Sequence, residues 1–433
     1  RIYNDNTLKK MKKTINISKW DTLSTKQKKA ITKINFTGTK KVSDITHRPT
    51  MAFATMCKDE EHCIGKTLNA VKDYVDYVVV ADNGSTDTTF DVVKAFFKES
   101  GLPGSWHIDP WEGYAINKTK MMGYIKDKTD YLLHLDADDF LEGDFYFTHS
   151  DVGYDYYSME MRRGASTWKA TVVYDNSLTW RFIGTAHTVI KANERPKSTS
   201  LGDLTRRGYC NANGIGSRAF DPKKFWYDGE RLTKQFWDCL ISDPDGLLTR
   251  SAFYAGQSYE NYGKDGCLEK GLQWYKIFML FPNTWIEERF EAQVRISRCL
   301  MQLENHKENF NEIKFELDKA IEIFDDRAEP YFFMGRYCCK NGRHELAYEY
   351  LKKAEKCSLE NAQEKYTLFI NTSAYGLYVN DWLSVACFWT KRIEEGRKLI
   401  YEVINHETFK HSVDHYKSNL NHFNELEKTI NEN

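Results

Sequence analysis

Apolar stretches and amphipathic stretches alternate along residues 51–135. Short apolar runs are typical of buried strands, and apolar side chains that recur every three or four residues are typical of helices. We expect strands at 51–57, 77–81, 106–108 and 131–135. We expect helices at 64–71, about 88–98 and 117–126. This alternation predicts an α/β domain with a mostly parallel sheet and right-handed crossovers.

The pattern changes after Gly143. Strand-like segments follow, and we expect them to form an antiparallel extension of the sheet, at 154–161, 168–174 and 180–183. From about residue 223 the pattern becomes helical, and two similar segments, 254–259 and 333–338, lie 79 residues apart. Such a spacing indicates repeated helical hairpins, although ordinary helical packing is an alternative. The pattern therefore predicts an N-terminal extension (1–46), an α/β domain (47–222) and an all-α repeat domain (223–433).

Two clusters of aspartates directly follow predicted strands. Asp82 and Asp87 lie in the segment Asp-Asn-Gly-Ser-Thr-Asp, and Asp136 and Asp138 lie in the segment Asp-Ala-Asp-Asp. Ligands of open α/β sheets bind at the carboxyl ends of the strands, and two carboxylates two residues apart can hold Mg²⁺ or Mn²⁺ beside phosphate oxygens. The first cluster alone would also suit a turn with a helix cap. Together the clusters indicate a metal-dependent enzyme with a nucleotide-linked substrate.

Composition narrows the classes of partner and compartment. The formal net charge of −1 gives no reason to expect a nucleic-acid partner. The ten cysteines are scattered and include the adjacent pair Cys338 and Cys339, which favours reduced thiols and a reducing compartment. No run of about 18 apolar residues occurs, and the first 46 residues lack the apolar core of a signal peptide. We therefore expect a cytoplasmic protein without a transmembrane segment.

The first 46 residues are basic and polar. Lysines gather at 9–13 and again at 26–29, and a short helix capped by Ser24 is expected over 24–34. One interpretation is a solvated extension that packs on the α/β domain. The other is an electrostatic contact with an anionic acceptor or surface.

Taken in order, these motifs make the protein resemble glycosyltransferase family 2, from about Met51 to His187. The residues that carry the resemblance are the first strand with the segment 57–61, the loop 82–87, and the segment 135–139. The resemblance implies a GT-A nucleotide-sugar-binding domain. A helical array that follows such a domain is similar to members with tetratricopeptide-like repeats, some of which glycosylate peptides.

The resemblance also implies roles for individual residues. Thr55 and the loop of Asp59 and Glu60 would line the pocket for the base and ribose, and Asp82 would accept a hydrogen bond from the base. Asp136 would contact ribose or the metal, and Asp138 would ligate the ion, Mn²⁺ or Mg²⁺, that bridges the diphosphate.

Two further motifs depart from those of the relatives. Where relatives have Arg-Asn before the second aspartate cluster, this sequence offers Lys120 or Lys118 to the diphosphate. His187 would be a third metal ligand and, with Asp138, a catalytic residue, although a structural histidine is the alternative. Relatives have Glu after this histidine, and this sequence has Thr188.

The expected function is metal-dependent transfer of a sugar from a nucleoside diphosphate sugar, with UDP-sugar favoured, to a hydroxyl or thiol of a glycan, protein or peptide acceptor. The resemblance implies an inverting course, in which a carboxylate deprotonates the acceptor. Three residues are candidates for this base: Asp139, Glu160 and Asp221. The helical region is expected to recognise the acceptor or a partner, or to form a homodimer.

Two other functions remain open. A nucleotidyltransferase or phosphatase could use the same carboxylates, but no GxxxxGK[ST] loop is present. A catalytically degenerate scaffold that binds partners through its helices is the other, and the intact carboxylate set argues against it.

Overall fold

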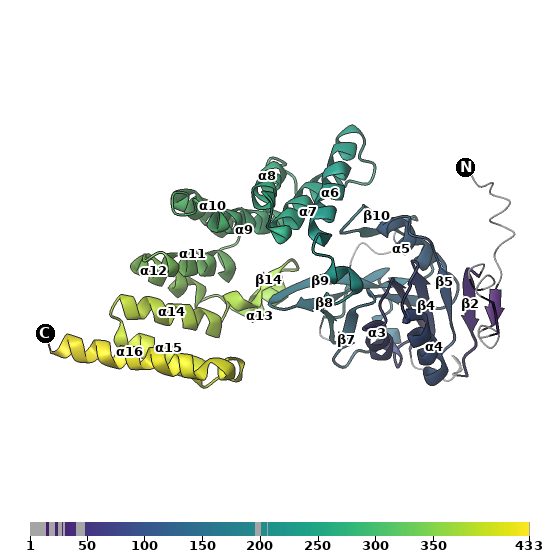
Figure 1. The fold of residues 1–433 in the computed structure, drawn as a ribbon, viewed down its shortest axis with the longest axis horizontal. Coiled ribbons are helices and arrows are strands. Elements are labelled where there is room, and N and C mark those ends of the chain that lie inside the picture. Colours follow the sequence, from purple (N-terminus) through teal and green to yellow (C-terminus); the bar gives the residue numbers. More distant parts are fainter. Residues whose placement is uncertain are drawn as a thin grey trace. The chain divides into compact units, whose positions relative to one another are not determined.

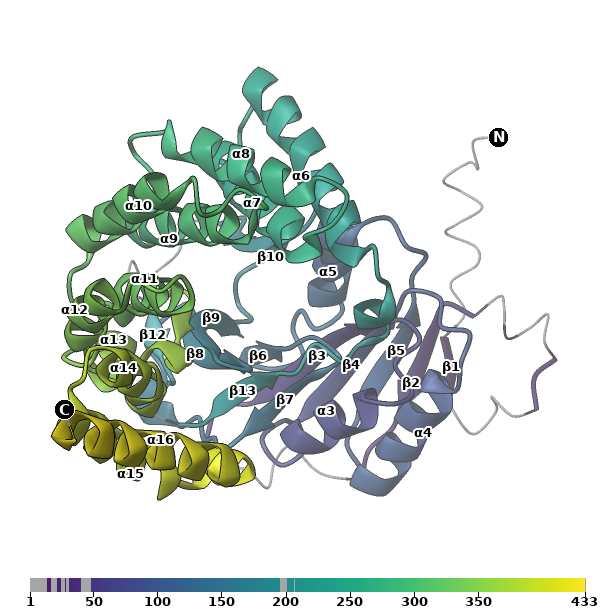
Figure 2. The ribbon, with the colours of Figure 1, turned by 60° about the vertical axis from the view of Figure 1, so that its left-hand side comes forward.

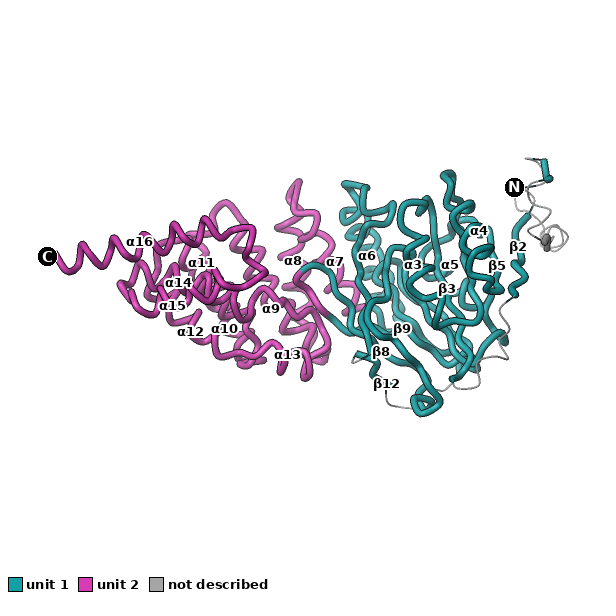
Figure 3. The backbone as a smooth tube through the Cα atoms, turned by 90° about the horizontal axis from the view of Figure 1, so that it is seen from below, with its two compact units in different colours: residues 1–164, 168–247 teal, residues 165–167, 248–433 magenta. Residues whose placement is uncertain are grey.

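The computed structural model describes residues 14–16, 22–24, 28, 31–39, 48–194, 201–205 and 207–432. The protein divides into two compact units, one of residues 1–164 and 168–247 and one of residues 165–167 and 248–433 (Figure 3). The lysines at 9–13 and residues 25–27, 29 and 30 of the helix expected over 24–34 lie outside the described residues. The end of that expected helix is wrong, because Lys33–Phe36 is a strand.

The first unit contains a large mixed sheet (Figure 1). Its strands are β1 (Thr14–Asn16), β2 (Lys33–Phe36), β3 (Met51–Cys57), β4 (Tyr77–Asp82), β5 (Gly104–Ile108), β6 (Tyr131–His134), β7 (Asp139–Glu142), β8 (Tyr156–Arg163), β9 (Ser166–Asp175), β12 (Gly202–Asp203) and β13 (Tyr209–Ala212). The order is β1-β2-β5-β4-β3-β6-β9-β8-β13-β7, with β12 beside β8. Strands β3, β4, β5 and β6 are parallel to their neighbours in this group, as the sequence predicts.

The outer strands depart from the expected extension. Strand β9 is antiparallel to β6, but β13 runs parallel to β8 and antiparallel to β7. Strands β10 (Trp180–Ile183) and β11 (Val189–Ala192) form a separate antiparallel hairpin. The expected extension is therefore antiparallel only in part.

Alternate residues of the central strands enter two cores, because successive strand side chains point to opposite faces. On β3, Met51 and Phe53 join one core with helices α3 (Ile64–Val71) and α4 (Thr89–Ser100). Ala52 and Ala54 join the other core with helix α5 (Tyr114–Gly123). Helices therefore cover both faces of the parallel strands, as is usual for α/β sheets.

Strand β3 lies between β4 and β6, so the crossovers on its two sides run in opposite directions. Such a switch point opens a crevice outside the carboxyl ends of the strands. The two predicted aspartate clusters follow β4 and β6 and therefore lie at this edge. The first unit ends with α6 (Lys224–Ile241), a helix that the sequence pattern places in the repeat domain.

The second unit is helical, as predicted. Its helices are α7 (Leu248–Tyr262), α8 (Cys267–Met279), α9 (Ile286–Gln302), α10 (Phe310–Ile323), α11 (Ala328–Lys340), α12 (His344–Ala354), α13 (Leu359–Lys365), α14 (Leu377–Trp389), α15 (Ile393–Ile404) and α16 (Val413–Asn431). Four hairpins form, α7 with α8, α9 with α10, α11 with α12, and α14 with α15 (Figure 2). Strand β14 (Ile370–Asn371) pairs with Ser166 and Thr167 inside this unit.

The predicted repeat has a packing reason. Gly256 and Gly335 hold equivalent places in the first helices of two hairpins. A Cβ on Gly256 would lie 2.8 Å from Tyr275, and one on Gly335 would lie 2.5 Å from Leu351. Only glycine allows the second helix of each hairpin to approach this closely. None of the helices in the described ranges has the length and hydropathy needed to cross a membrane.

Candidate functional site

The end of β4 presents a buried carboxylate. Asp82 pairs in register with Cys57 of β3 and is only 5% exposed. Its Oδ1 accepts hydrogen bonds from the backbone N–H of Ser85 (2.9 Å) and from the Ser85 hydroxyl (2.6 Å). Burial raises the pKa of Asp82, although these hydrogen bonds lower it in part. The left-handed backbone of Gly84 (φ +98°) lets the loop turn back onto the carboxylate.

The loops that follow β3 and β4 are bound to each other. The Asp59 carboxylate accepts from the backbone N–H of Thr86 (2.6 Å), and the backbone N–H of Asp59 donates to the Ser85 hydroxyl (2.9 Å). The Thr55 side chain is fully buried on β3, and its hydroxyl has no hydrogen-bond partner among the described residues. The structure thus brings Asp59 and Asp82 to one edge, with Thr55 beneath it.

Lys118 neutralises the first aspartate of the second cluster. Its Nζ lies 2.7 Å from Oδ1 of Asp136, and this cation lowers the pKa of Asp136 to about 2. Lys120 instead forms an ion pair with Glu112. Residues two apart on a helix point in different directions, so only one of the two lysines can face the aspartates. Of the two lysines considered from the sequence, the structure places Lys118 there.

Asp138 and Glu60 converge on one glycine. The backbone N–H of Gly216 donates to Oδ2 of Asp138 (2.9 Å). A Cβ on Gly216 would lie 3.1 Å from that oxygen and 3.1 Å from Oε1 of Glu60. Ser217 donates its backbone N–H to Glu60 (3.0 Å) and its hydroxyl to the carbonyl of Lys58 (2.7 Å). Two carboxylates therefore form a small cradle, with the loop after β13 seated in it.

Other polar groups surround this cradle. Asp139 is buried at the start of β7, and burial together with Asp136 and Asp138 raises its pKa well above the ordinary value. Burial raises the pKa of Glu60 too. The guanidinium of Arg163 donates to the carbonyl of Ala212 (2.7 Å), in the strand that precedes the Gly216 loop.

The other candidate bases differ from Asp139 in exposure and partners. Glu160 forms an ion pair with Arg162. Asp221 is exposed after the short 3₁₀ helix Ser217–Phe220 and accepts from the backbone N–H of Lys223 (2.9 Å).

His187 is exposed between β10 and β11 with a left-handed backbone (φ +47°). Among the described residues, it does not form with Asp136 and Asp138 a group whose ligand atoms all lie within 4.8 Å of one another. Among the residues that the structure describes, one group of three such side chains has ligand atoms within 4.8 Å of each other, namely Glu60, His62 and Cys63. Both potential partners of Glu60 are engaged: the Cys63 thiol donates to Glu60 (3.1 Å), and Nε2 of His62 lies 2.7 Å from the Ile215 carbonyl.

Sequence reasoning missed the contribution of Gly216 and Ser217. They lie about 80 and 160 residues from their partners Asp138 and Glu60, and the segment has the composition of an ordinary loop. Two glycines and a serine within 214–217 were the available signal, because small residues allow a backbone to approach a ligand or a carboxylate closely.

Comparison with known proteins agrees with this geometry. Residues 53–147 match the model of glycosyl transferase family 2. The matched segment therefore resembles a glycosyl transferase family 2 domain. It contains Asp59, Glu60, Asp82, Asp136 and Asp138.

One curated relative is the uncharacterized glycosyltransferase RT0209 of Rickettsia typhi, 34% identical over 82 residues. That match covers 19% of the present sequence and 25% of the relative, so the present sequence spans about a quarter of the relative's length.

Solved structures give weaker likenesses. TarS of S. aureus is 12% identical, and the match covers 64% of the present protein and 53% of TarS with a TM-score of 0.31. Its fragment 1–349 in complex with UDP-GlcNAc is 12% identical, with coverages of 64% and 90% and a TM-score of 0.30. MamA is 16% identical, with coverages of 44% and 88% and a TM-score of 0.31. TM-scores this low carry no functional argument. Any functional argument rests instead on the family match and the site geometry.

Proposed function

We propose that this protein is a glycosyltransferase that moves a sugar from a nucleoside diphosphate sugar, with UDP-sugar favoured, to a hydroxyl or thiol acceptor. The observation that carries the proposal is the placement of Asp82, Asp136 and Asp138 after β4 and β6, the two strands that flank β3, inside the segment that matches family 2. Loop bonds hold Asp59 beside the Asp82 loop. This arrangement suits a ligand with a base, a ribose and a diphosphate in sequence.

The chemistry of Asp138 and Glu60 suits a divalent ion. Both side chains offer carboxylate oxygens, the ligands that Mg²⁺ and Mn²⁺ prefer, and each has an oxygen 3.1 Å from the position that a Cβ on Gly216 would take. The Gly216 loop, which the cradle holds in this structure, would have to make room for the ion. Asp138 would hold the ion with Glu60 beside it, and Asp136 remains a proposed contact to ribose or the ion. Bound there, the ion would neutralise charge on the departing diphosphate. His187 would have to move to join them.

The protein's own groups supply the remaining roles. Asp82 accepts a hydrogen bond from the base, and the Asp59 loop closes on the ribose. Lys118 lies beside Asp136 and contributes positive charge to the diphosphate, as a single ammonium without the paired contacts of an arginine. A carboxylate deprotonates the acceptor as it attacks the anomeric carbon from the opposite face, which gives an inverting transfer. Asp139, Glu160 and Asp221 are the candidates for this base.

The helical unit supplies acceptor or partner recognition in this proposal. Stacked hairpins form an extended surface, and the donor-binding groups named above all belong to the first unit. A glycan, protein or peptide acceptor and a homodimer through this unit both suit such a surface.

Donor binding and hydrolysis test the proposal directly. The full-length protein is mixed with UDP-, GDP- and dTDP-sugars with and without Mn²⁺, and thermal stability and free nucleotide are measured. A UDP-sugar should raise the melting temperature, more so with Mn²⁺, and should be hydrolysed slowly. If no nucleotide sugar stabilises the protein and none is hydrolysed, the scaffold alternative replaces the enzyme.

A further inference from the structure

The turn after β3 gathers three different kinds of metal-binding side chain. The carboxylate of Glu60, the imidazole of His62 and the thiol of Cys63 have ligand atoms that all lie within 4.8 Å of one another. We call these three residues the mixed ligand group. Sγ of Cys63 lies 3.1 Å from Oε2 of Glu60, and Nε2 of His62 lies 4.0 Å from the same oxygen. A tetrahedral zinc ion with the usual bond lengths holds such ligand atoms about 3.4–3.6 Å apart, so the group is close to the spacing that zinc requires.

A tight turn before α3 brings these side chains together. The backbone N–H groups of Cys63 and Ile64 both donate to the carbonyl of Glu60, over 3.1 and 3.0 Å. The backbone N–H of Glu60 donates in turn to the hydroxyl of Thr89 on α4 (2.8 Å). The backbone that carries the ligands is therefore fixed before any ion arrives, and an ion would pay little to order it.

The two oxygens of Glu60 face different groups. Oε2 lies beside the other members of the mixed ligand group, whereas Oε1 lies 3.1 Å from the position that a Cβ on Gly216 would take, as Oδ2 of Asp138 does. Ser217 donates its hydroxyl to Oε1 (3.2 Å), and hydrogen bonds of this kind orient a ligating carboxylate. Glu60 can therefore offer Oε2 to one ion while Oε1 faces the cradle that it forms with Asp138.

Two protons now occupy the directions that an ion would take. The Cys63 thiol donates to Glu60, and Nε2 of His62 lies 2.7 Å from the carbonyl of Ile215, which can only accept. Burial raises the pKa of the Cys63 thiol, so the thiol keeps its proton while no ion is bound. A bound cation replaces that proton, which leaves for solvent, and the imidazole proton moves from Nε2 to Nδ1.

The ligand types and their exposure select the ion. Thiolate and imidazole are ligands that zinc prefers, whereas Mg²⁺ and Mn²⁺ prefer oxygen. The His62 side chain is 38% exposed and gives an ion a way in, and Cys63 is buried behind it. Three protein ligands leave a fourth position for water.

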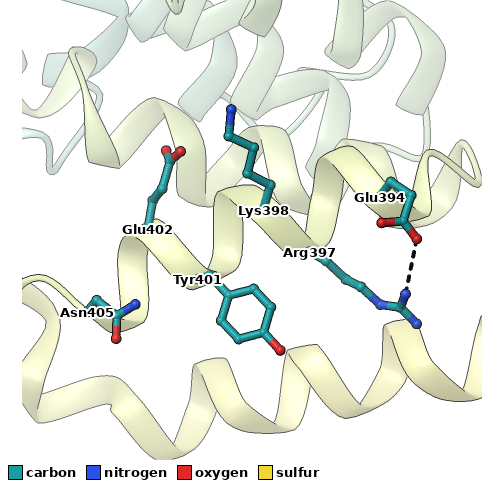
Figure 4. Close-up of a pocket in the computed structure, with 6 residues that line it drawn as sticks. All are labelled: Glu394, Arg397, Lys398, Tyr401, Glu402 and Asn405. Carbon is teal, nitrogen blue, oxygen red and sulfur yellow. Dashed lines mark hydrogen bonds and ion pairs between the residues drawn. The ribbon is translucent and has the colours of Figure 1, made fainter.

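A hollow in the second unit shows the contrasting case. It has a volume of about 410 Å³ (Figure 4). It is lined by Glu394, Arg397, Lys398, Tyr401, Glu402 and Asn405. Its arginine, Arg397, is paired with Glu394 (3.2 Å) and with Glu427. None of these lining residues is a His or a Cys, and a cation already neutralises one of the carboxylates, so the hollow has nothing that would select zinc.

We propose that Glu60, His62 and Cys63 bind one zinc ion through Oε2, Nε2 and Sγ, with water as the fourth ligand. This inference goes beyond sugar transfer and does not depend on it, since it concerns an ion held by a thiolate and an imidazole outside the aspartate clusters. Only the folded protein holds the three ligands together, so zinc should also raise the melting temperature.

Binding of Co²⁺ to the full-length protein tests the inference, because Co²⁺ enters zinc sites and absorbs visible light. The reduced, metal-free protein is titrated with Co²⁺ and then with Zn²⁺. We expect one Co²⁺ per chain, with a thiolate-to-metal charge-transfer band and the visible bands of tetrahedral coordination, all of which Zn²⁺ removes. Cys63→Ser should abolish the charge-transfer band. Cys63→Ser and His62→Gln should each weaken zinc binding at least about tenfold, since even changes around a ligand cost that much.

Cys239→Ser and Cys357→Ser are the matched controls, because these cysteines are partly exposed and lie outside the mixed ligand group. Both should leave the band and the zinc affinity unchanged, and so should Asp138→Asn, which removes the proposed ligand of the donor ion. Circular dichroism establishes that the variants fold. If Cys63→Ser does not fold, X-ray absorption of the zinc-loaded wild type still shows whether sulfur is a ligand.

Four results would overturn the inference. The first is no binding of Co²⁺, and the second is binding without the thiolate band. The third is zinc affinity in Cys63→Ser and His62→Gln equal to that of the wild type. The fourth is loss of the band in a control variant, which would place the ion at a surface thiol or in the aspartate cradle.

Discussion

Buried carboxylates of the two units illustrate two ways of burying charge. In the first unit, burial raises the pKa of Glu60 and Asp82, and no nearby cation lowers these pKa values again. In the second unit, burial alone would raise the pKa of Glu260, but Arg295 and Arg298 lower it below its ordinary value. A buried charge that has a partner of opposite charge helps to hold the fold. A buried charge without such a partner is tolerated where a ligand supplies the missing charge.

The same criterion distinguishes arginines within the second unit. Burial alone would lower the pKa of Arg327, but Glu329 raises it, through hydrogen bonds of 2.8 and 2.9 Å. The pKa of Arg336 stays lowered, because no carboxylate offsets burial and Arg298. Arg327 therefore holds the fold together, whereas Arg336 of α11 has no such partner among the described residues.

The largest effect should follow from removing a carboxylate of the cradle. We expect Asp138→Asn to reduce sugar transfer about a thousandfold or more, because charge compensation for the diphosphate is lost. Its melting temperature should stay near that of the wild type. Asp127→Asn, at an exposed turn with a left-handed backbone that asparagine tolerates, is the control. Near-normal turnover in a folded Asp138→Asn protein would remove Asp138 from the mechanism.

Removing a charge that compensates a buried partner should lower stability and leave the donor site unchanged. Arg327→Met leaves Glu329 buried without its partner, which should cost about 3–5 kcal/mol of unfolding free energy. Denaturant unfolding followed by circular dichroism measures it, and affinity for a UDP-sugar should not change. Lys276→Met, which breaks an exposed pair with Glu312, should be nearly neutral. A loss of donor affinity with no loss of stability would contradict the comparison.

The two lysines of α5 provide a matched pair. Lys118→Met should raise the donor KM about tenfold, because it removes the cation beside Asp136, with a smaller change in kcat. Lys120→Met should leave the KM nearly unchanged, since Lys120 is paired with Glu112. Steady-state kinetics with a UDP-sugar measures both. Equal effects of the two substitutions would mean that the pairing seen for Lys118 has no role in donor binding.

The local parts of the fold were predictable from the sequence. The strands at 51–57 and 131–134 are apolar on both faces because helices cover both sides of the sheet. Their sequences are therefore continuous apolar runs, and such runs identify buried strands. The repeat was visible through Gly256 and Gly335, which a close helix approach requires. These features depend on neighbouring residues, so a local pattern carries them.

The site was predictable only as far as its aspartates. Choosing between Lys118 and Lys120 needs the phase of α5, which begins at Tyr114, three residues before the expected start. The contacts of Gly216 with the cradle depend on how β13 enters the sheet, beside β8 and β7, and no local pattern records that. The position of β2 beside β5 is a long-range pairing of the same kind.

Asp82 should show a small effect on stability, opposite in sign to its effect on donor binding. Its folded-state pKa is raised, so the folded protein takes up this proton more readily than the unfolded protein. The stability that Asp82 contributes is therefore fully present below the unfolded pKa of about 3.9 and is lost as the pH rises through the higher folded value. At pH 7 the wild type carries a buried, uncompensated carboxylate. Asp82→Asn removes that charge and retains an oxygen for the two hydrogen bonds from Ser85.

We expect Asp82→Asn to be at least as stable as the wild type at pH 7, with an advantage that shrinks as the pH falls toward 4. The same change should raise the donor KM about tenfold, because an amide accepts a hydrogen bond from the base less strongly than a carboxylate. Thermal unfolding across a pH series and donor kinetics measure the two effects, with exposed Asp73→Asn as the control. Lower stability at pH 7 with an unchanged KM would make Asp82 a structural turn residue. Higher stability with weaker donor binding is the result expected of a residue that is kept for its ligand at the expense of the fold.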